Sequence, residues 1–512
     1  WKSVLDAVLV RVLPPRPVFR LAFRAGLSKS ERTLVVKAAV LGKGGCLEEA
    51  HQLERVFLAS RDCGEELSLG LLVDLPERNT PLAQTDRESL SRLKSVLDKL
   101  NRKYGGRFFL FFRAPVYQNR QGTFSGWERK RGALLELAQM LRARRSGIEV
   151  YSGDRTRLNR VRYLVVLDSD TDPGVGGIRP LVGAMRHPLN RPVLDERRRV
   201  VRAGYGIIQP QIRTELAAAS ATPFARFFSG GAGSDPYRGS HSELCHELFD
   251  ESSFCGKGIL DIDCFLTCLE GRFPEQRVLS HDILEGAYLR TGYLSQISFR
   301  DGFPATVSSF YRRQHRWVRG DWQNFAWVLP HVPSGEGAEQ NPISAVSRWK
   351  LADNLRRSLT PVAQMVCLLW AAAAGDGFGW LGWIALASVA LDPILAYVFD
   401  IIPRRSLRRF HSRIQTGLRG MVLGIGVRLA LLPLEGWINL TAICTALWRS
   451  LISHKNLLQW TTSAQQSAVG GGLLSTCLPI LAVGLGTAAV TRRPAALLLA
   501  LLCYLLLESQ AK

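Results

Sequence analysis

Residues 162–174 read RYLVVLDSDTDPG, an apolar run that ends in two carboxylates, Asp168 and Asp170, followed by a Pro-Gly turn. An unbroken run of aromatic and β-branched residues predicts a buried strand, here 162–167. A D-x-D pair alone is most often a solvated turn. At the end of a buried strand, however, two carboxylates offer the oxygen ligands that Mg²⁺ and Mn²⁺ prefer. The position therefore favours a divalent-metal site formed by Asp168 and Asp170.

Apolar runs alternate with helical patterns upstream of this strand. Strands are predicted at 33–41, 67–75 and 107–112, and helices at 47–59, 90–100 and 134–142. This alternation with short connections is typical of a mostly parallel α/β sheet covered by helices on both faces. Ligands of such sheets bind beyond the carboxyl ends of the strands. Asp74 and Asp168 both fall at predicted strand ends, so we expect a binding site there.

The composition is that of a basic, globular chain. Of 512 residues, 46% are hydrophobic and 21% charged, and the formal net charge is +22. The hydrophobic share excludes a disordered chain. No nucleic-acid module motif accompanies the positive charge, so nucleic acid is not an expected partner. The ten cysteines include no C-x-x-C pair, which predicts reduced thiols in a cytosol-facing protein rather than zinc ligands or disulfides.

Long apolar stretches follow residue 355. They are 361–374, 378–399, 417–432, 473–490 and 494–507, from which we expect about four membrane-spanning helices. Buried helices of a large soluble core are the alternative. The positive-inside rule places the Arg-rich segment 404–413 on the cytoplasmic side. The mixture of aromatic and basic residues in 437–459 predicts a helix lying at the membrane surface.

Three parts are therefore expected. Residues 1–30 form a basic, interfacial segment, residues 31–340 an α/β domain, and residues 341–512 the transmembrane and interfacial helices. The first segment contains too many arginines and prolines for the apolar core of a secretory signal.

Two polar motifs lie between the sheet and the apolar stretches. In HDILEG (281–286), Asp282 can act as a general base, and Glu285 falls on the same helical face. The same residues are equally an ordinary helix start with acids in the first turn. RRQHRWVRGDWQ (312–323) has more arginines than its one acid can pair, and Arg forks suit phosphate oxygens. A basic helix leaning on anionic lipid is the competing explanation for this second motif.

Two glycine-bearing stretches complete the set. GWERKRG (126–132) precedes a helix, so its basic side chains and backbone N–H groups could bind a diphosphate. The glycines of FCGKGILDID (254–263) would allow the backbone to approach a sugar closely. Neither stretch is a P-loop, and each alone is compatible with a plain loop.

Taken in order, five blocks resemble the glycosyltransferase part of bacterial cyclic β-1,2-glucan synthases, an inverting, family 84-like GT-A group. They are GWERKRG, VVLDSDTDPG, FCGKGILDIDCF, HDILEG and HRWVRGDWQ. The resemblance runs from about residue 32 to 323 and continues at 432–465. It implies a GT-A glycosyltransferase domain, UDP-glucose as donor, a growing β-glucan chain as acceptor, and Mg²⁺ or Mn²⁺. It also implies a multi-pass protein of the bacterial inner membrane whose catalytic domain faces the cytoplasm.

The resemblance also assigns roles to residues. On the donor side it places Asp74, Lys130, Arg131, Gly132, Asp168 and Asp170, of which Asp168 and Asp170 hold the metal. On the acceptor and product side it places Gly256, Lys257, Gly258, Gln314, Arg316 and Trp317. Asp282 takes the place of the base that deprotonates the acceptor hydroxyl. One residue separates Gln314 from Arg316, where related cellulose and hyaluronan synthases have two.

Members of this family are long and carry a phosphorylase-like domain, so we expect the chain to be a piece of a longer polypeptide. Two alternatives stay open. A processive β-1,3- or β-1,4-glycan synthase shares the D-x-D and Arg-Trp motifs. A non-catalytic membrane scaffold would need none of this chemistry.

Overall fold

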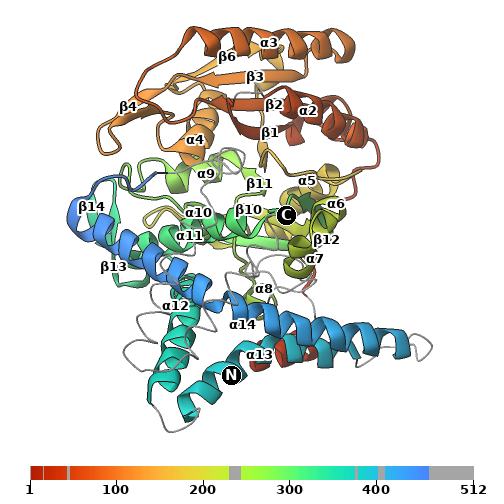
Figure 1. The fold of residues 1–512 in the computed structure, drawn as a ribbon. Helices are drawn as coiled ribbons and strands as arrows, with labels where there is room; N and C mark the ends of the chain where they lie inside the picture. Colours follow the sequence, from red (N-terminus) through yellow and green to blue (C-terminus); the bar gives the residue numbers. More distant parts are fainter. Residues whose placement is uncertain are drawn as a thin grey trace.

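The computed structural model describes residues 2–14, 16–42, 46–229, 244–374, 379–401 and 410–459. Its centre is an eight-stranded sheet with the strand order β12-β10-β11-β7-β1-β2-β3-β6, and helices cover both faces (Figure 1). The strands are β1 (Thr33–Val40), β2 (Leu67–Asp74), β3 (Phe108–Arg113), β6 (Ile148–Ser152), β7 (Tyr163–Leu167), β10 (Ile207–Thr214), β11 (Gly258–Asp261) and β12 (Thr291–Asp301).

The sheet is mostly parallel, as the sequence predicts. β1 pairs in parallel with β2 and β7, β2 with β3, and β10 with β12. β11 runs antiparallel between β7 and β10, and β6 closes the other edge antiparallel to β3. The predicted strands match β1, β2, β3 and β7 to within one residue at each end.

Two apolar cores lie on the two faces of the sheet. Helices α2 (Leu47–Ala59), α3 (Gln84–Tyr104) and α5 (Ile178–Arg186) cover one face. Helices α4 (Arg129–Leu141), α9 (Ile262–Leu269) and α10 (Asp282–Leu289) cover the other. Successive strand residues alternate between the cores: Val35 packs with the first set and Val36 with the second. Burial on both faces explains why these strands are apolar without interruption.

Smaller elements decorate this sandwich. They are α1 (Lys2–Val12), β4 (Val116–Gln118), β5 (Thr123–Ser125), β8 (Val193–Asp195), β9 (Val200–Ala203), α6 (Leu216–Ser220), α7 (Pro223–Phe228), α8 (Leu244–Phe249), β13 (His331–Ser334) and β14 (Gly337–Gln340). They form three two-stranded sheets and short connecting helices around the central layer.

Four long helices complete the fold. They are α11 (Val307–Gln323), α12 (Ala345–Ala374), α13 (Trp380–Ile401) and α14 (Phe410–Trp448), and α14 continues into a π-helical turn at Arg449–Ser453. Of these, α12, α13 and α14 lie below the sheet in Figure 1, and α11 lies beside α10. α11 packs against α14, which also packs against α12 and α13. The helical part is thus joined directly to the α/β domain through α11.

One helix in the described part of the chain, Gly417–Ser453, is long and apolar enough to cross a membrane, and Trp380–Leu395 is a shorter apolar helix. The expected spans at 473–490 and 494–507 lie outside the described residues, as does most of the Arg-rich segment 404–413. Residues 417–432 and 437–459 were expected to form a span and a separate surface helix. Instead, α14 runs through both up to Trp448 without a break.

Candidate functional site

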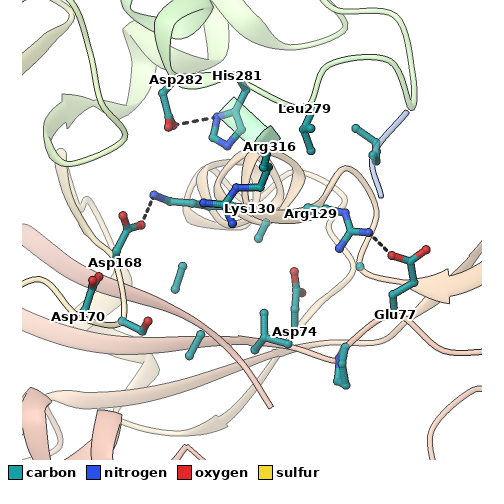
Figure 2. A pocket seen from close by; sticks show the side chains of 18 of the residues that line it. Asp74, Glu77, Arg129, Lys130, Asp168, Asp170, Leu279, His281, Asp282 and Arg316 are labelled. Atoms are coloured by element: carbon teal, nitrogen blue, oxygen red, sulfur yellow. Dashed lines mark hydrogen bonds and ion pairs between the residues drawn. The ribbon is translucent and has the colours of Figure 1, made fainter. Parts of the chain in front are cut away.

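Side chains from the carboxyl edge of the sheet meet in a cavity of about 1730 Å³. β1, β2 and β7 end there, and because β11 is antiparallel, its first residues arrive at the same edge. The starts of α4 and α10 and one side of α11 close the cavity (Figure 2). A further sector is lined by α12 and α14, through residues that include Asn354, Glu435 and Asn439.

Asp168 lies between two lysines. Its Oδ1 is 2.6 Å from Nζ of Lys130, and its Oδ2 is 3.1 Å from Nζ of Lys257. Lys130 also donates to the carbonyl oxygen of Gly256 at 2.9 Å. Burial alone would raise the pKa of Asp168, but the two ammonium groups outweigh it and hold that pKa well below its usual range. Asp168 is therefore a carboxylate at any physiological pH.

Asp170 lies in a different electrostatic setting. Its side chain projects into the cavity beside Asp168, and within the described residues it has no ion-pair partner. Partial desolvation raises its pKa, and the like charges of Asp301 and Asp168 raise it further. The turn therefore presents one carboxylate paired with lysines and one with no ion-pair partner among the described residues. An oxygen-preferring divalent ion fits such a donor set, so Asp168 and Asp170 can hold Mg²⁺ or Mn²⁺.

A buried layer beneath the turn joins the predicted Lys257 to residues that the sequence analysis did not identify. Asp301, at the end of β12, is fully buried; it accepts from Oγ1 of Thr171 at 2.7 Å and lies 2.5 Å from Nζ of Lys257. Lys37 of β1 donates to the carbonyl oxygen of Thr171 at 3.3 Å, and burial lowers its pKa to about 8. A lysine inside an apolar strand was the one signal of this layer in the sequence.

Asp74, the last residue of β2, is held by Arg113. The guanidinium binds it through two hydrogen bonds, Nε to Oδ1 at 2.8 Å and Nη2 to Oδ2 at 2.6 Å. Arg113 also donates to the carbonyl oxygens of Trp127 and Arg129 and therefore fixes the loop before α4, which carries Lys130. The sequence places Asp74 at the site but gives no sign of this partner.

Asp282 begins α10 on the opposite side of the cavity from Asp168 and Asp170 (Figure 2). Nδ1 of His281 is 3.3 Å from its Oδ1 and 2.9 Å from Oε1 of the buried Glu285. Burial would lower the pKa of His281, but Glu285 and then Asp282 raise it overall. Oδ1 of Asp282 is buried and accepts no hydrogen bond from the described residues. Since a buried acceptor is normally satisfied, this oxygen is available to a ligand hydroxyl.

His281, Asp282 and Glu285 also place three possible ligand atoms within 4.8 Å of one another. The short contact of the imidazole with Glu285 shows that this group is internally paired, unlike Asp170.

The three predicted residues of α11 line the cavity as well. Arg316 faces Asp168 and Asp282, whose charges raise its pKa, but burial dominates and lowers that pKa to about 10. The guanidinium of Arg313 stacks over the ring of Trp317, with its carbon 4.6 Å from the ring centroid. Gln314 donates to Oε1 of Glu435 at 3.1 Å and to Oδ1 of Asn439 at 3.0 Å. Both acceptors belong to α14, so α11 connects the site to the long apolar helix.

Three other predicted residues lie behind the cavity wall. Arg131 pairs with Glu128 at 2.6 Å. Gly132 is tightly packed, because a Cβ there would lie 1.9 Å from the carbonyl oxygen of Trp127. Gly258 begins β11, where a Cβ would lie 2.4 Å from the carbonyl oxygen of Ile208. Gly256 approaches the site more closely, since a Cβ on it would lie 2.7 Å from the carboxylate of Asp282.

Comparison with known proteins gives one extended similarity in sequence. No profile of a known protein family matches the chain. The chain is 33% identical over 487 residues to the cyclic β-(1,2)-glucan synthase NdvB of Rhizobium meliloti (strain 1021), an alignment that covers 92% of this chain and 17% of that protein. The expected resemblance to cyclic β-1,2-glucan synthases is thereby confirmed. The chain spans about a sixth of the length of this relative.

Among solved structures, the mannosyltransferase PcManGT of Pyrobaculum calidifontis, in complex with GDP-Man and Mn²⁺, is similar at a TM-score of 0.42 with 12% identity. The superposition covers 83% of this chain and 94% of that one.

Proposed function

Because the chain is homologous to a segment of a cyclic β-(1,2)-glucan synthase, we propose that it is a GT-A-type glycosyltransferase: a membrane-embedded, inverting glucosyltransferase that uses UDP-glucose to build a β-1,2-glucan. One observation carries the proposal. An acidic turn, Asp168 and Asp170, and a carboxylate with an oxygen that accepts no hydrogen bond from the described residues, Asp282, face each other across one cavity, with Lys130 and Arg316 between them (Figure 2).

The donor side of the cavity suits a nucleotide diphosphate. Lys130 and Arg316 supply positive charge, and the D-x-D turn lies at the carboxyl edge of a mostly parallel sheet. Asp168 and Asp170 would hold Mg²⁺ or Mn²⁺, which, when bound, offsets the negative charge of the departing diphosphate. Asp74, at the end of β2, lies on the side of the cavity that we assign to the nucleotide.

Asp282 supplies the base of a single displacement. Its carboxylate takes the proton of the acceptor 2-hydroxyl as that oxygen forms its bond to C1 of glucose. The bond from C1 to the diphosphate oxygen breaks, and its electron pair leaves with UDP. Attack from the side opposite the leaving group inverts C1, which agrees with a base and a diphosphate site on opposite sides of one cavity.

We assign the α11 side of the cavity to the β-glucan acceptor. Gln314, Arg316 and Trp317 line it, and Gly256 leaves room beside Asp282. The sector continues to α14, the helix that is long and apolar enough to cross a membrane. We therefore place the protein in the bacterial inner membrane as a multi-pass protein whose catalytic domain faces the cytoplasm, and as part of a polypeptide with further domains.

Membranes containing the protein, supplied with radiolabelled UDP-glucose and Mn²⁺, test this function. We expect UDP release and a labelled polymer that a β-1,2-glucanase degrades. A polymer resistant to that enzyme but with β-1,3 or β-1,4 linkages would identify a different processive synthase. If no nucleotide is released from UDP-glucose or from other nucleotide sugars, catalysis is refuted, and the non-catalytic membrane scaffold becomes the remaining explanation. Asp263→Asn, at an exposed carboxylate remote from the cavity, is the matched control.

A further inference from the structure

Lys257 lies between two carboxylates rather than on one. Its Nζ is 2.5 Å from Oδ2 of Asp301 and 3.1 Å from Oδ2 of Asp168. Lys257 immediately precedes β11 and Asp301 ends β12, and both residues lie at the carboxyl edge of the sheet next to the D-x-D turn. The resemblance to glucan synthases places Lys257 with the acceptor, whereas its contacts place it on the donor side.

The two contacts of Lys257 differ in what their loss would cost. Asp301 is 0% exposed, whereas the side chain of Asp168 is 34% exposed at the cavity wall. An unpaired buried carboxylate is strongly destabilising, and an unpaired carboxylate open to water or to a cation is not. Lys257 can therefore give up Asp168 readily, but not Asp301.

Both oxygens of Asp168 carry an ammonium group in this arrangement, since Lys130 lies on Oδ1 and Lys257 on Oδ2. A divalent cation shared by Asp168 and Asp170 needs at least one of those oxygens. A metal ion at an oxygen that already accepts from an ammonium group lies close to a like charge, and the two cations repel each other.

We propose that Lys257 competes with the divalent cation for Asp168, and that Asp301 retains the lysine when the cation binds. The Lys257–Asp301 pair thereby sets the metal affinity of the donor site. The inference rests on the proposed function, because it takes Asp168 and Asp170 as the metal-binding pair. It assigns to Lys257 a positioning role at the metal site.

Two substitutions should shift the affinity in opposite directions. Asp301→Asn removes the carboxylate that retains Lys257, so the lysine should bind Asp168 more firmly and Mn²⁺ affinity should fall by about tenfold or more. Lys257→Met removes the competitor, so Mn²⁺ should bind more tightly. The double variant Lys257→Met/Asp301→Asn removes both charges of the pair together, and its Mn²⁺ affinity should recover by at least about tenfold relative to Asp301→Asn.

Mn²⁺ titrations followed by electron paramagnetic resonance, with Mn²⁺ alone and with Mn²⁺ plus UDP, measure this without turnover. Lys94→Met, at an exposed lysine paired with Asp98, is the control and should bind like the wild type. If Asp301→Asn and the double variant lose Mn²⁺ equally, or if the wild type binds none, the inference is wrong. The double variant decides the matter even if Lys257→Met alone does not fold.

The proposed function fails separately. A protein that shows the opposite shifts in Mn²⁺ affinity but releases no UDP from UDP-glucose would keep the lysine competition and lose the glucosyltransferase. A protein that turns over UDP-glucose, but in which Asp301→Asn and Lys257→Met shift the Mn²⁺ affinity in the same direction, would keep the glucosyltransferase and lose the lysine competition.

Discussion

Replacing Asp282 by asparagine removes the proposed base, and we expect it to leave the fold and the donor site intact. The amide has nearly the same shape as the carboxylate, and Oδ1 accepts no hydrogen bond from the described residues. The substitution therefore breaks no hydrogen bond at that atom; it removes the charge 3.3 Å from Nδ1 of His281, which keeps its closer contact with Glu285. Lys130 loses one of two attracting carboxylates but keeps its 2.6 Å contact with Asp168. We expect the stability of the protein to change by only about 1 kcal/mol or less.

The expected loss is in the rate of transfer. Loss of a general base costs about 10²–10⁴-fold, which raises the barrier by about 2.7–5.4 kcal/mol. Binding of UDP should stay within about threefold of the wild type, since the variant keeps Asp168, Asp170 and Arg316. The loss should therefore fall on kcat rather than on the donor affinity.

Isothermal titration with UDP and Mn²⁺ gives the donor affinity, and UDP release under saturating donor gives the rate. Asp263→Asn, with its exposed carboxylate, serves as the matched control. Turnover near the wild-type rate in Asp282→Asn would show that another group takes the proton. Loss of UDP binding as complete as in Asp168→Asn would show that Asp282 belongs to the donor site.

Three further predictions concern the buried charges. Arg113→Met leaves Asp74 and two backbone carbonyls without their donor, so it should destabilise the protein by about 3–5 kcal/mol, seen as a lower thermal midpoint. UDP binding should weaken as well, because the start of α4, which carries Lys130, would be displaced; an unchanged midpoint would contradict this prediction. Asp168→Asn should abolish Mn²⁺-dependent UDP binding without loss of fold, checked by titration and circular dichroism. Burial raises the pKa of Asp321 to about 6, so the stability associated with its protonated form is present below about pH 4 and is lost as pH rises through 6. Asp321→Asn should therefore melt several degrees above the wild type at pH 8 and close to it at pH 4; a difference that does not depend on pH would refute the sign.

Much of the α/β domain could be predicted because its strands are buried on both faces. Such strands are continuous apolar runs, and the carboxylates that end them, Asp74 and Asp168, mark the edge where ligands bind. Lys130 and Asp282 were found through short motifs, and both line the cavity.

The charged layer beneath the site could not be predicted in the same way. Arg113 lies 39 residues from Asp74, Lys257 lies 44 from Asp301, and Lys37 lies 134 from Thr171. No local pattern joins residues so far apart, since only the strand order brings them together.

The division of α14 into two helices was wrong for a related reason. The mixture of aromatic and basic residues in 437–459 made that stretch look like a separate surface helix, and Glu435 and Asn439 lie at the junction. In the folded protein they lie inside a continuous helix, where they accept hydrogen bonds from Gln314 of α11. Polar residues within a long apolar helix can indicate a contact with a neighbouring helix as readily as the end of a membrane span.

In the membrane location that we propose, the two hydrogen bonds between Gln314 and α14 would make the bilayer a regulator of the site. A helix that crosses a membrane answers a thicker or thinner hydrocarbon layer by changing its tilt. Since Glu435 and Asn439 line the cavity and hold α11, a change in the tilt of α14 would move one wall of the acceptor sector. Lipid chain length then becomes a variable of the reaction, and nanodiscs of graded thickness would show it as a graded change in turnover at constant donor affinity.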